Sequence, residues 1–302
     1  MSPILVGTAS WTDKHLIESG RFYTPEVRTP EERLRFYAEH FPVVEVDSSY
    51  YALPTARNAI LWSERTPAGF VFDIKAYRLF TQHQTPPASL PPDLRAALGA
   101  IDKKNLYLHD LPEELQIELW RRFIAGIEPL RRAGKLGAVL FQMPPWVVNS
   151  QASRRHLEAC AEVLKGYTLA VEFRNHTWLD EKHVENTLAF EREHGFVHVV
   201  VDGPQGFFNS VPAIWAATSV ELAIVRLHGR NAETWNLKGL KSSADRFNYL
   251  YSADELCDLG ASIRTLSGRA KRTHVLFNNN YGDYAQRNAL QMRELLAPGT
   301  AL

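Results

Sequence analysis

Ionisable residues stand two positions apart near the ends of several short apolar runs in this 302-residue chain. The pairs are Glu45 with Asp47, Glu172 with Arg174, and Arg226 with His228. In a β-strand, side chains two positions apart point to the same face. A charge held in a protein interior needs a partner, because its desolvation is otherwise costly. We therefore expect three cations to neutralise three acids in one polar site: Lys75, Arg174 and Arg226 with Glu45, Asp47 and Glu172.

Four of these residues are candidates for catalysis: Glu45, Lys75, Glu172 and His228. Glu172 or His228 can shuttle a proton. Lys75 can stabilise an oxyanion or, less readily, form a Schiff base. A structural alternative carries equal weight, namely that Glu45 and Lys75 form only an interior salt bridge.

The candidates for substrate binding are Trp11, Asp47, Tyr51, Gln142, Arg174, Trp178, Asp202, Arg226, Asn278 and Asn279. The arginines can bind a phosphate or a carboxylate through two parallel hydrogen bonds. Replacing Arg226 with Ala is therefore expected to abolish ligand binding and leave the fold intact. The aromatic side chains, Tyr50 among them, either wall the site and stack on a ring or belong to the core.

Eight short apolar, β-branched runs carry these residues at their ends. They span 4–8, 43–47, 70–75, 138–142, 168–173, 197–202, 222–228 and 274–278. Amphipathic stretches separate most of them, and parallel strands need such crossovers. The pattern predicts an α/β fold, one (β/α)8 TIM-barrel domain over residues 1–302. In such a barrel all strand C-termini meet at one face, so the polar residues converge there.

Local signals mark the helices and one irregular segment. Thr29 before Pro30 is typical of a helix start, and Ser252 with Glu255 has capping-box spacing. Residues 82–135, after the third strand, form an elaborated loop-helix segment with helices expected near 93–103 and 112–133. This segment is either a lid over the site or a surface elaboration.

Composition excludes several classes of function. The 34 basic and 34 acidic residues cancel, so no net charge draws the chain to nucleic acid or to a membrane, although a local basic groove stays open. Cys160 and Cys257 are too few for a disulfide framework or a zinc knuckle. There is no signal peptide and no apolar membrane span, so we expect a cytoplasmic protein. The sequence contains no dinucleotide-binding glycine motif after the first strand, no P-loop, no zincin motif and no nucleophile elbow of the α/β-hydrolases.

Nine motifs resemble those of the YecE-like family, also called domain of unknown function 72. They are GTASW (7–11), FYTPE (22–26), VVEVDSSYYALP (43–54), FVFDIKA (70–76), LFQMPP (140–145), VEFRNHTW (171–178), VRLHGRN (225–231), NYLYSADEL (248–256) and FNNNYGDYAQRNA (277–289). The resemblance implies a TIM barrel and no established reaction. Two departures stand out: Gln82 separates Thr81 from His83, which counts against His83 as a site residue, and Asp47 and Tyr50 stand where Asn and Phe are usual.

The leading hypothesis is an enzyme, a hydrolase, lyase or isomerase without a nucleotide cofactor, acting on a small anionic or phosphorylated, sugar-like substrate. A metal held by Glu172, Asp202 and His228 is the second possibility, disfavoured because Arg174 and Arg226 compete for the carboxylates. A nucleic-acid-binding or phosphodiester-cleaving barrel is the third, and a non-catalytic ligand-binding barrel the fourth. No resident cofactor is expected.

Overall fold

The computed structural model describes residues 2–99, 101–207, 210–237, 239, 243–297 and 299. Eight parallel strands close into a barrel in sequence order, with β8 pairing back onto β1. The strands are β1 Ile4–Ala9, β2 Val43–Val46, β3 Val71–Lys75, β4 Leu136–Gln142, β5 Leu169–Glu172, β6 Val197–Asp202, β7 Ala223–Leu227 and β8 Thr273–Phe277. The expected (β/α)8 barrel is confirmed, and each strand overlaps its predicted run.

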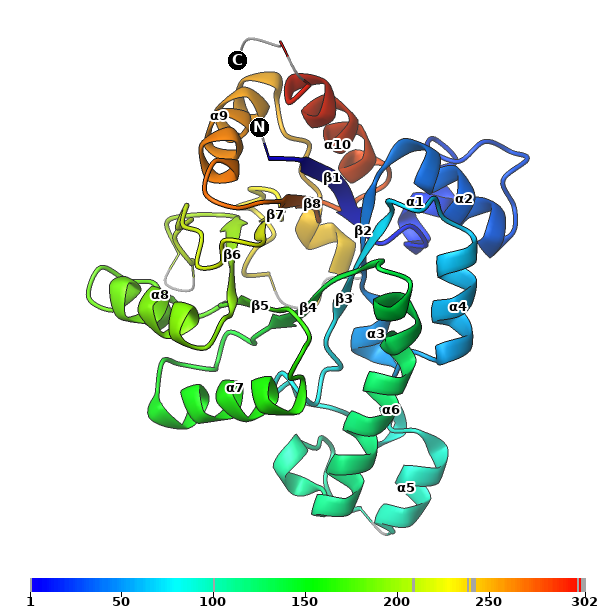
Figure 1. The fold of residues 1–302 in the computed structure, drawn as a ribbon, viewed down its shortest axis with the longest axis vertical. Helices are drawn as coiled ribbons and strands as arrows, with labels where there is room; N and C mark the ends of the chain where they lie inside the picture. Colours follow the sequence, from blue (N-terminus) through cyan, green and yellow to red (C-terminus); the bar gives the residue numbers. More distant parts are fainter. Residues whose placement is uncertain are drawn as a thin grey trace.

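Helices surround the barrel (Figure 1). They are α1 Lys14–Ser19, α2 Pro30–His40, α3 Ser48–Tyr51, α4 Ala56–Glu64, α5 Pro92–Leu98, α6 Glu113–Arg132, α7 Gln151–Val163, α8 Val184–Glu193, α9 Ala253–Ser267 and α10 Tyr284–Leu295. Short 3-10 turns are η1 Pro87–Ser89, η2 Leu108–Asp110, η3 His176–Trp178 and η4 Ser243–Phe247. The connection between β6 and β7 contains no helix among its described residues. In the described part of the chain, no helix is both long and apolar enough to span a bilayer.

Helix starts follow the local sequence signals. Thr29 caps α2 and Ser252 caps α9, and in both cases the acid three residues later completes a capping box. Reciprocal bonds of this kind satisfy amide donors that the first helical turn leaves free. The predicted starts of both helices are therefore confirmed.

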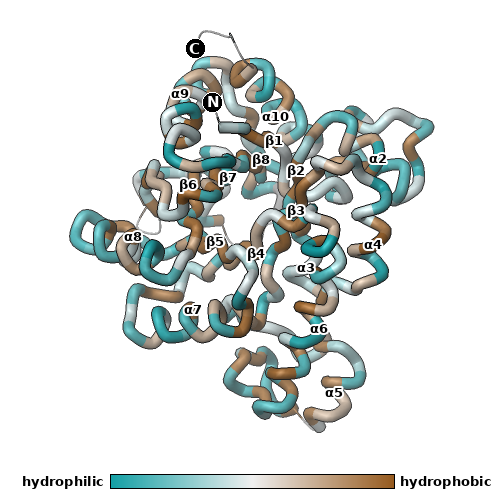
Figure 2. Tube along the Cα trace, viewed as in Figure 1, coloured by the Kyte–Doolittle hydropathy of each residue, from teal (hydrophilic) through white to brown (hydrophobic). Residues whose placement is uncertain are grey.

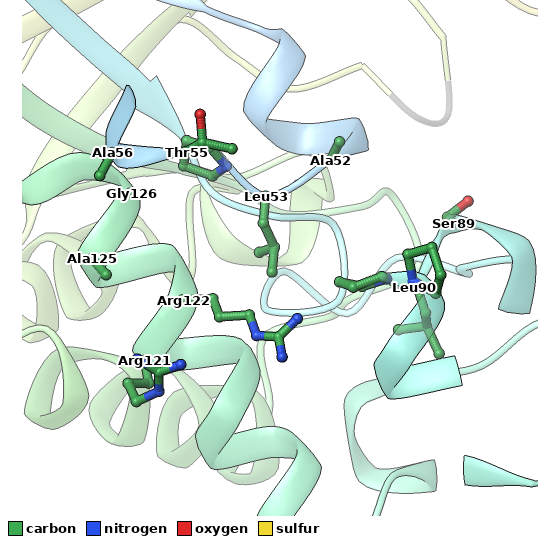
Figure 3. Close-up of a pocket in the computed structure, with 13 residues that line it drawn as sticks. Ala52, Leu53, Thr55, Ala56, Ser89, Leu90, Arg121, Arg122, Ala125 and Gly126 are labelled. Carbon is green, nitrogen blue, oxygen red and sulfur yellow. The ribbon is translucent and has the colours of Figure 1, made fainter. Parts of the chain in front are cut away.

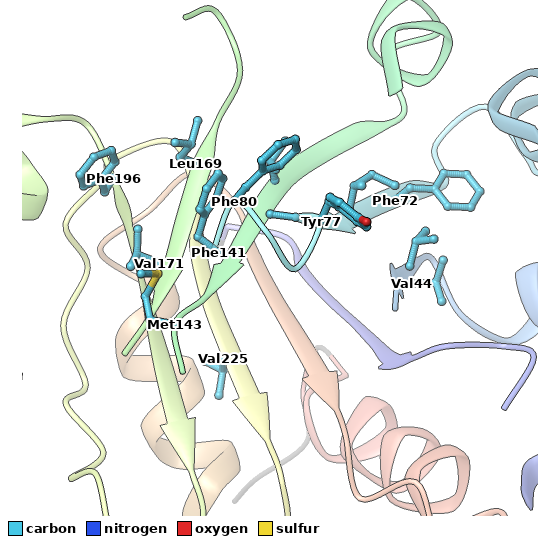
Figure 4. Close-up of a cluster of buried hydrophobic side chains, with 14 of the residues drawn as sticks. Val44, Phe72, Tyr77, Phe80, Phe141, Met143, Leu169, Val171, Phe196 and Val225 are labelled. Carbon is cyan, nitrogen blue, oxygen red and sulfur yellow. The ribbon is translucent and has the colours of Figure 1, made fainter. Parts of the chain in front are cut away.

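The apolar core lies in two places. The larger part fills the layer between strands and helices, and Figure 4 shows side chains of this layer such as Phe72, Phe80 and Phe141. A smaller cluster, which includes Val43, Leu140 and Leu276, fills the inside of the barrel. Hydrophobic residues concentrate along the strands, whereas hydrophobic and hydrophilic residues alternate along the helices (Figure 2). The packed interior leaves the strand ends as the place for polar groups.

The segment after β3 lies mostly beside the barrel. Helix α6 packs along α4, and α5 lies at the end of α6 away from the strands (Figure 1). Gly126 permits this packing, because a Cβ there would lie 2.1 Å from the carbonyl oxygen of Pro54. The predicted helix near 112–133 matches α6, whereas α5 ends at Leu98, earlier than expected. The beginning of the segment, around His83, borders the strand ends.

Candidate functional site

The predicted polar residues meet around the guanidinium of Arg226. Its Nε and Nη2 donate to the two carboxylate oxygens of Glu45 at 2.8 and 2.6 Å, and its Nη1 donates to Glu172. All three side chains are fully buried. Because every nitrogen of Arg226 already serves an internal carboxylate, the expected direct contact between Arg226 and a ligand is corrected. Arg226 is the counter-ion that ties β7 to β2 and β5.

Glu172 collects further donors from neighbouring strands. Its Oε1 accepts from Gln142 Nε2 at 2.7 Å and from Arg174 Nη1 at 3.0 Å. Nε2 of His228 lies 3.3 Å from the same oxygen. Burial raises the pKa of Glu172, but the charges of Arg226 and Arg174 and the hydrogen bond with His228 outweigh it and hold the pKa well below the usual range. Glu172 is therefore an ionised hub rather than a proton donor.

His228 is held neutral beside this hub. Burial lowers its pKa to about 4, despite the opposing effect of Glu172. The side-chain nitrogen of Asn278 lies 2.7 Å from Nδ1 of His228 and donates to it, which leaves the ring proton on Nε2, toward Glu172. Asn278 thus sets the tautomer of His228. The predicted convergence of these residues is present, and their roles in catalysis and binding stay predictions.

Lys75 pairs with Asp47 and not with Glu45. The ammonium donates to Asp47 Oδ1 at 3.0 Å, and the two side chains keep 12% and 25% of their surface exposed. The Glu45–Lys75 salt bridge of the structural alternative is therefore not formed. Burial lowers the pKa of Lys75, but the charge of Asp47 outweighs it and raises the pKa above its ordinary value. A permanently protonated amine suits an oxyanion better than a Schiff base.

The carboxyl groups of Glu45 and Asp47 differ in their affinity for a proton. Burial raises the pKa of Glu45 to about 7 against the charge of Arg226. At Asp47 burial acts in the same direction, but the charges of Lys75 and Arg226 and a hydrogen bond with Glu45 bring the pKa below its ordinary value. Two adjacent carboxyls whose pKa values are pushed apart are suited to exchange one proton. Asp47 is the member that reaches the surface.

Two site residues escaped the sequence prediction: Arg78 and His83, both in the loop after β3. The Arg78 guanidinium and the Lys75 ammonium lie 5.3 and 5.1 Å from the Tyr50 ring, and the His83 ring lies 5.1 Å from it. Burial and the charges of Lys75, Arg78 and Arg174 lower the pKa of His83 to about 3. The Gln82 insertion, which counted against His83, adopts a positive φ of 61° directly before it. The only sequence signal for Arg78 was its place just past a strand end.

A segment between β7 and α9 covers part of the site. The Trp235 ring lies 5.3 Å from the Arg174 guanidinium, and the Phe247 ring lies 5.9 Å from His228. The chain enters this segment at Gly229, whose φ is 83° and where a Cβ would lie 2.7 Å from that of Tyr249. The rings of Trp235 and Phe247 thus come from this segment. Of the two alternatives for residues 82–135, a lid or a surface elaboration, the lateral position of α5 and α6 favours the surface elaboration.

Two predicted substrate-binding residues hold that covering segment instead. Asp202 accepts from the guanidinium of Arg230 at 2.8 to 3.1 Å and from the hydroxyl of Tyr251 at 2.7 Å. Asn279 donates to the carbonyl of Tyr249 and to Asn288, both at 2.9 Å. Because these groups serve the segment, their expected contact with a substrate is corrected to a positioning role.

The predicted aromatic walls lie in different environments. Trp178 is fully buried, stacks on Phe173 at 4.1 Å and donates to the Val147 carbonyl, so of the two alternatives for the aromatic residues, site wall or core, it belongs to the core. Trp11 is also a core residue, packed edge-on against Trp62. Tyr51 is 60% exposed at the rim beside Tyr50, and its role stays a prediction.

The donors proposed for a metal are not assembled. Glu172 and His228 are neighbours, but Asp202 is turned to Arg230 and Tyr251. Among the described residues, no three His, Cys, Asp or Glu side chains are grouped so as to hold a metal ion.

Two cavities lie near the C-terminal face. One, of about 510 Å³, lies between the loop after α3, the turn before α5 and α6 (Figure 3). Its two arginines, Arg121 and Arg122, are already paired with Glu118, and Arg122 also binds Asp93. The other, of about 520 Å³, is bordered by Gln82 and Trp146, next to His83.

Comparisons with known proteins agree with this fold. The family model described as "Protein of unknown function DUF72" matches residues 5–301. UPF0759 protein YunF of Bacillus subtilis (strain 168) is 34% identical over 295 residues, which are 97% of this chain and 94% of that protein. The crystal structure of a DUF72 family protein from Enterococcus faecalis V583 matches with a TM-score of 0.75 and 27% identity, covering 98% of both chains. A DUF72 family protein from Thermotoga maritima MSB8 matches with a TM-score of 0.73 and 31% identity, covering 97% of this chain and 99% of that one. The chain belongs to the DUF72 family, a TIM-barrel family of unknown function.

Proposed function

We propose that this protein is an enzyme that binds a small anionic, sugar-like substrate, phosphorylated substrates included, at the C-terminal ends of its barrel strands. One observation carries the proposal. The Arg78 guanidinium and the Lys75 ammonium both lie over the Tyr50 ring, and Arg78 has no carboxylate partner among the described residues. Its Nη2 donates to the Gln84 carbonyl, whereas its Nε is buried without a partner.

Charge balance around the strand ends supports an anionic ligand. Four cations, Lys75, Arg78, Arg174 and Arg226, face the three acids Glu45, Asp47 and Glu172, and Asp13 interacts electrostatically with Asp47. These charges balance, and a positive charge is in excess when Glu45 is protonated. A second unpartnered donor, Nε1 of Trp235, belongs to the ring that lies over Arg174. Because buried donors without acceptors are costly, a bound oxyanion would stabilise these groups.

The accessible side chains suggest how chemistry would proceed. Arg78 and Arg174 would hold the anionic group, and the permanently charged Lys75 would stabilise negative charge that develops in the transition state. Asp47 would accept a proton from the substrate or return one to it. Glu45, which lies behind Asp47, would in turn exchange a proton with Asp47 near neutral pH. Such chemistry fits a hydrolase, lyase or isomerase and uses no nucleotide cofactor.

Replacing Arg78 with Gln tests the anion site. Loss of one charge-assisted hydrogen bond should weaken binding of inorganic phosphate and of glucose 6-phosphate about tenfold or more, as measured by isothermal titration calorimetry. Arg57→Gln, which removes an exposed arginine of α4, is the matched control and should leave both affinities unchanged. Equal phosphate affinity in the wild type and in Arg78→Gln would contradict the proposal.

A non-catalytic ligand-binding barrel is the second candidate. It is favoured by the complete burial of Glu172 and His228, which keeps both away from a ligand in this structure. Such a barrel would bind the same anions and convert none of them. Product analysis after incubation with a panel of sugar phosphates separates the two candidates.

A further inference from the structure

The cavity of about 520 Å³ beside His83 differs in chemistry from the strand-end site. It lies between the beginning of the segment after β3 and the connection from β4 to α7, at the same end of the barrel. Its size falls in the range of small-molecule pockets. The residues that matter for its chemistry are Gln82, Tyr107, His109, Gln116, Trp146 and Ser153.

A row of rings joins this cavity to the anion site. The ammonium of Lys75 lies 5.1 Å from the Tyr50 ring, and that ring lies 5.1 Å from His83. His83 in turn lies 5.8 Å from the Trp146 ring, which borders the cavity. The cavity is therefore separated from Lys75 by the rings of Tyr50, His83 and Trp146, and a molecule that occupies both places would pass over their outer edges.

The cavity wall carries no Lys, Arg, Asp or Glu among its described lining residues. His156, at its inner side, has its pKa lowered by burial and bonds the Phe80 carbonyl through Nε2 at 2.7 Å. The remaining polar groups are the amides of Gln82 and Gln116, the hydroxyls of Tyr107 and Ser153 and the imidazole of His109. Nε2 of Gln116 already donates to the Leu111 carbonyl at 2.8 Å, which leaves its amide oxygen for a ligand. Such a wall offers hydrogen bonds without a net charge, so it suits a neutral polar group.

Trp146 supplies the platform for that group. It is 52% exposed, an unusual state for a large ring. The rings of Tyr107 and His109 are nearly parallel, at 5°, but they are stacked on each other and leave no slot between them. A single platform with amides at its edge matches the apolar face of a sugar ring, whereas a nucleobase gains most from a slot with two faces.

We propose that the cavity bordered by Trp146 is a second subsite, which binds a neutral sugar ring of a substrate whose anionic group lies at Lys75, Arg78 and Arg174. The inference rests on the proposed function and narrows it to a phosphorylated or otherwise anionic saccharide of at least two rings. Trp146 and the amides of Gln82 and Gln116 then determine how many sugar rings the preferred substrate has.

Calorimetric titration of the full chain tests the subsite with four probes: inorganic phosphate, glucose 6-phosphate, trehalose 6-phosphate and AMP. The phosphorylated disaccharide should bind wild type at least about tenfold more tightly than glucose 6-phosphate. Trp146→Ala should remove that advantage and leave the affinities for phosphate and glucose 6-phosphate unchanged. Ile60→Ala, which truncates an exposed apolar side chain on α4, serves as the control and should change nothing.

The outcomes separate the two proposals. If phosphate binds but the disaccharide gains nothing over glucose 6-phosphate, or its gain survives Trp146→Ala, the subsite is overturned and the anion site stands. If AMP binds more tightly than the phosphorylated disaccharide, and this advantage disappears in Trp146→Ala, the assignment of the cavity to a sugar ring is overturned. If neither phosphate nor any phosphorylated probe binds, the anion site itself falls.

Discussion

Two layers of polar groups at the strand ends differ in how completely their charges are satisfied. The inner layer, Arg226 with Glu45, Glu172 and His228, is fully buried, and each guanidinium nitrogen of Arg226 has an internal acceptor. The outer layer, defined by Lys75, Asp47, Arg78, Arg174 and His83, is partly exposed and contains a cation without a carboxylate partner among the described residues. The inner layer therefore builds the barrel mouth, and the outer layer has capacity left for a ligand.

The largest difference between the layers should be in stability. Arg226→Ala leaves two buried carboxylates without their counter-ion and should lower the free energy of unfolding by about 3–5 kcal/mol. This prediction from the structure replaces the expectation from sequence that Arg226→Ala keeps an intact fold. Arg78→Gln removes a cation that binds the Gln84 carbonyl and lies over the Tyr50 ring, so its unfolding free energy should fall by no more than about 1 kcal/mol. Urea denaturation measures both.

A combined variant sharpens that result. Glu45→Gln and Glu172→Gln together with Arg226→Met remove the acids along with the arginine, and should recover part of the lost stability. If Arg226→Ala is no less stable than Arg78→Gln, the division into two layers is incorrect.

A smaller effect should appear in the pH dependence of anion binding. Burial and the three cations lower the pKa of His83 to about 3. A sulfate ion beside Lys75, Arg78 and Arg174 would offset those charges and raise the pKa, so the complex holds more protons than the free protein. Sulfate should therefore bind more tightly as the pH falls below the ordinary histidine value of 6.5.

At about pH 5, where Glu45 with its pKa of about 7 is already protonated, calorimetry in buffers of different ionisation enthalpy measures proton uptake by His83 directly. His83→Gln should abolish most of it and leave sulfate binding at neutral pH nearly unchanged. Proton release on sulfate binding, or uptake that persists in His83→Gln, would place the anion away from these cations.

The barrel and the set of neutralising charges could be predicted because both follow from local patterns. Short β-branched runs set the strands, and alternate positions brought Glu45, Glu172 and Arg226 to one interior. The pairing among them could not be predicted, because Arg226 and Glu45 are 181 residues apart and packing decides which acid each cation meets. Arg78 lies beyond the strand, where no periodicity places a side chain.

Trp178 shows the opposite failure. It follows a strand end in sequence, as a site residue would, but the 3-10 turn at His176–Trp178 directs the indole back against Phe173. A strand-end position therefore predicts nearness to the site for short polar residues better than for large rings, whose burial stabilises the core.

A crystal structure of the protein with sulfate bound tests the two-layer arrangement most directly. The anion should lie within hydrogen-bonding distance of Arg78 and Arg174, beside Lys75, with Arg226 still bound to Glu45 and Glu172. A sulfate bound instead by Arg226, or an empty outer layer in crystals that hold sulfate elsewhere, would contradict it.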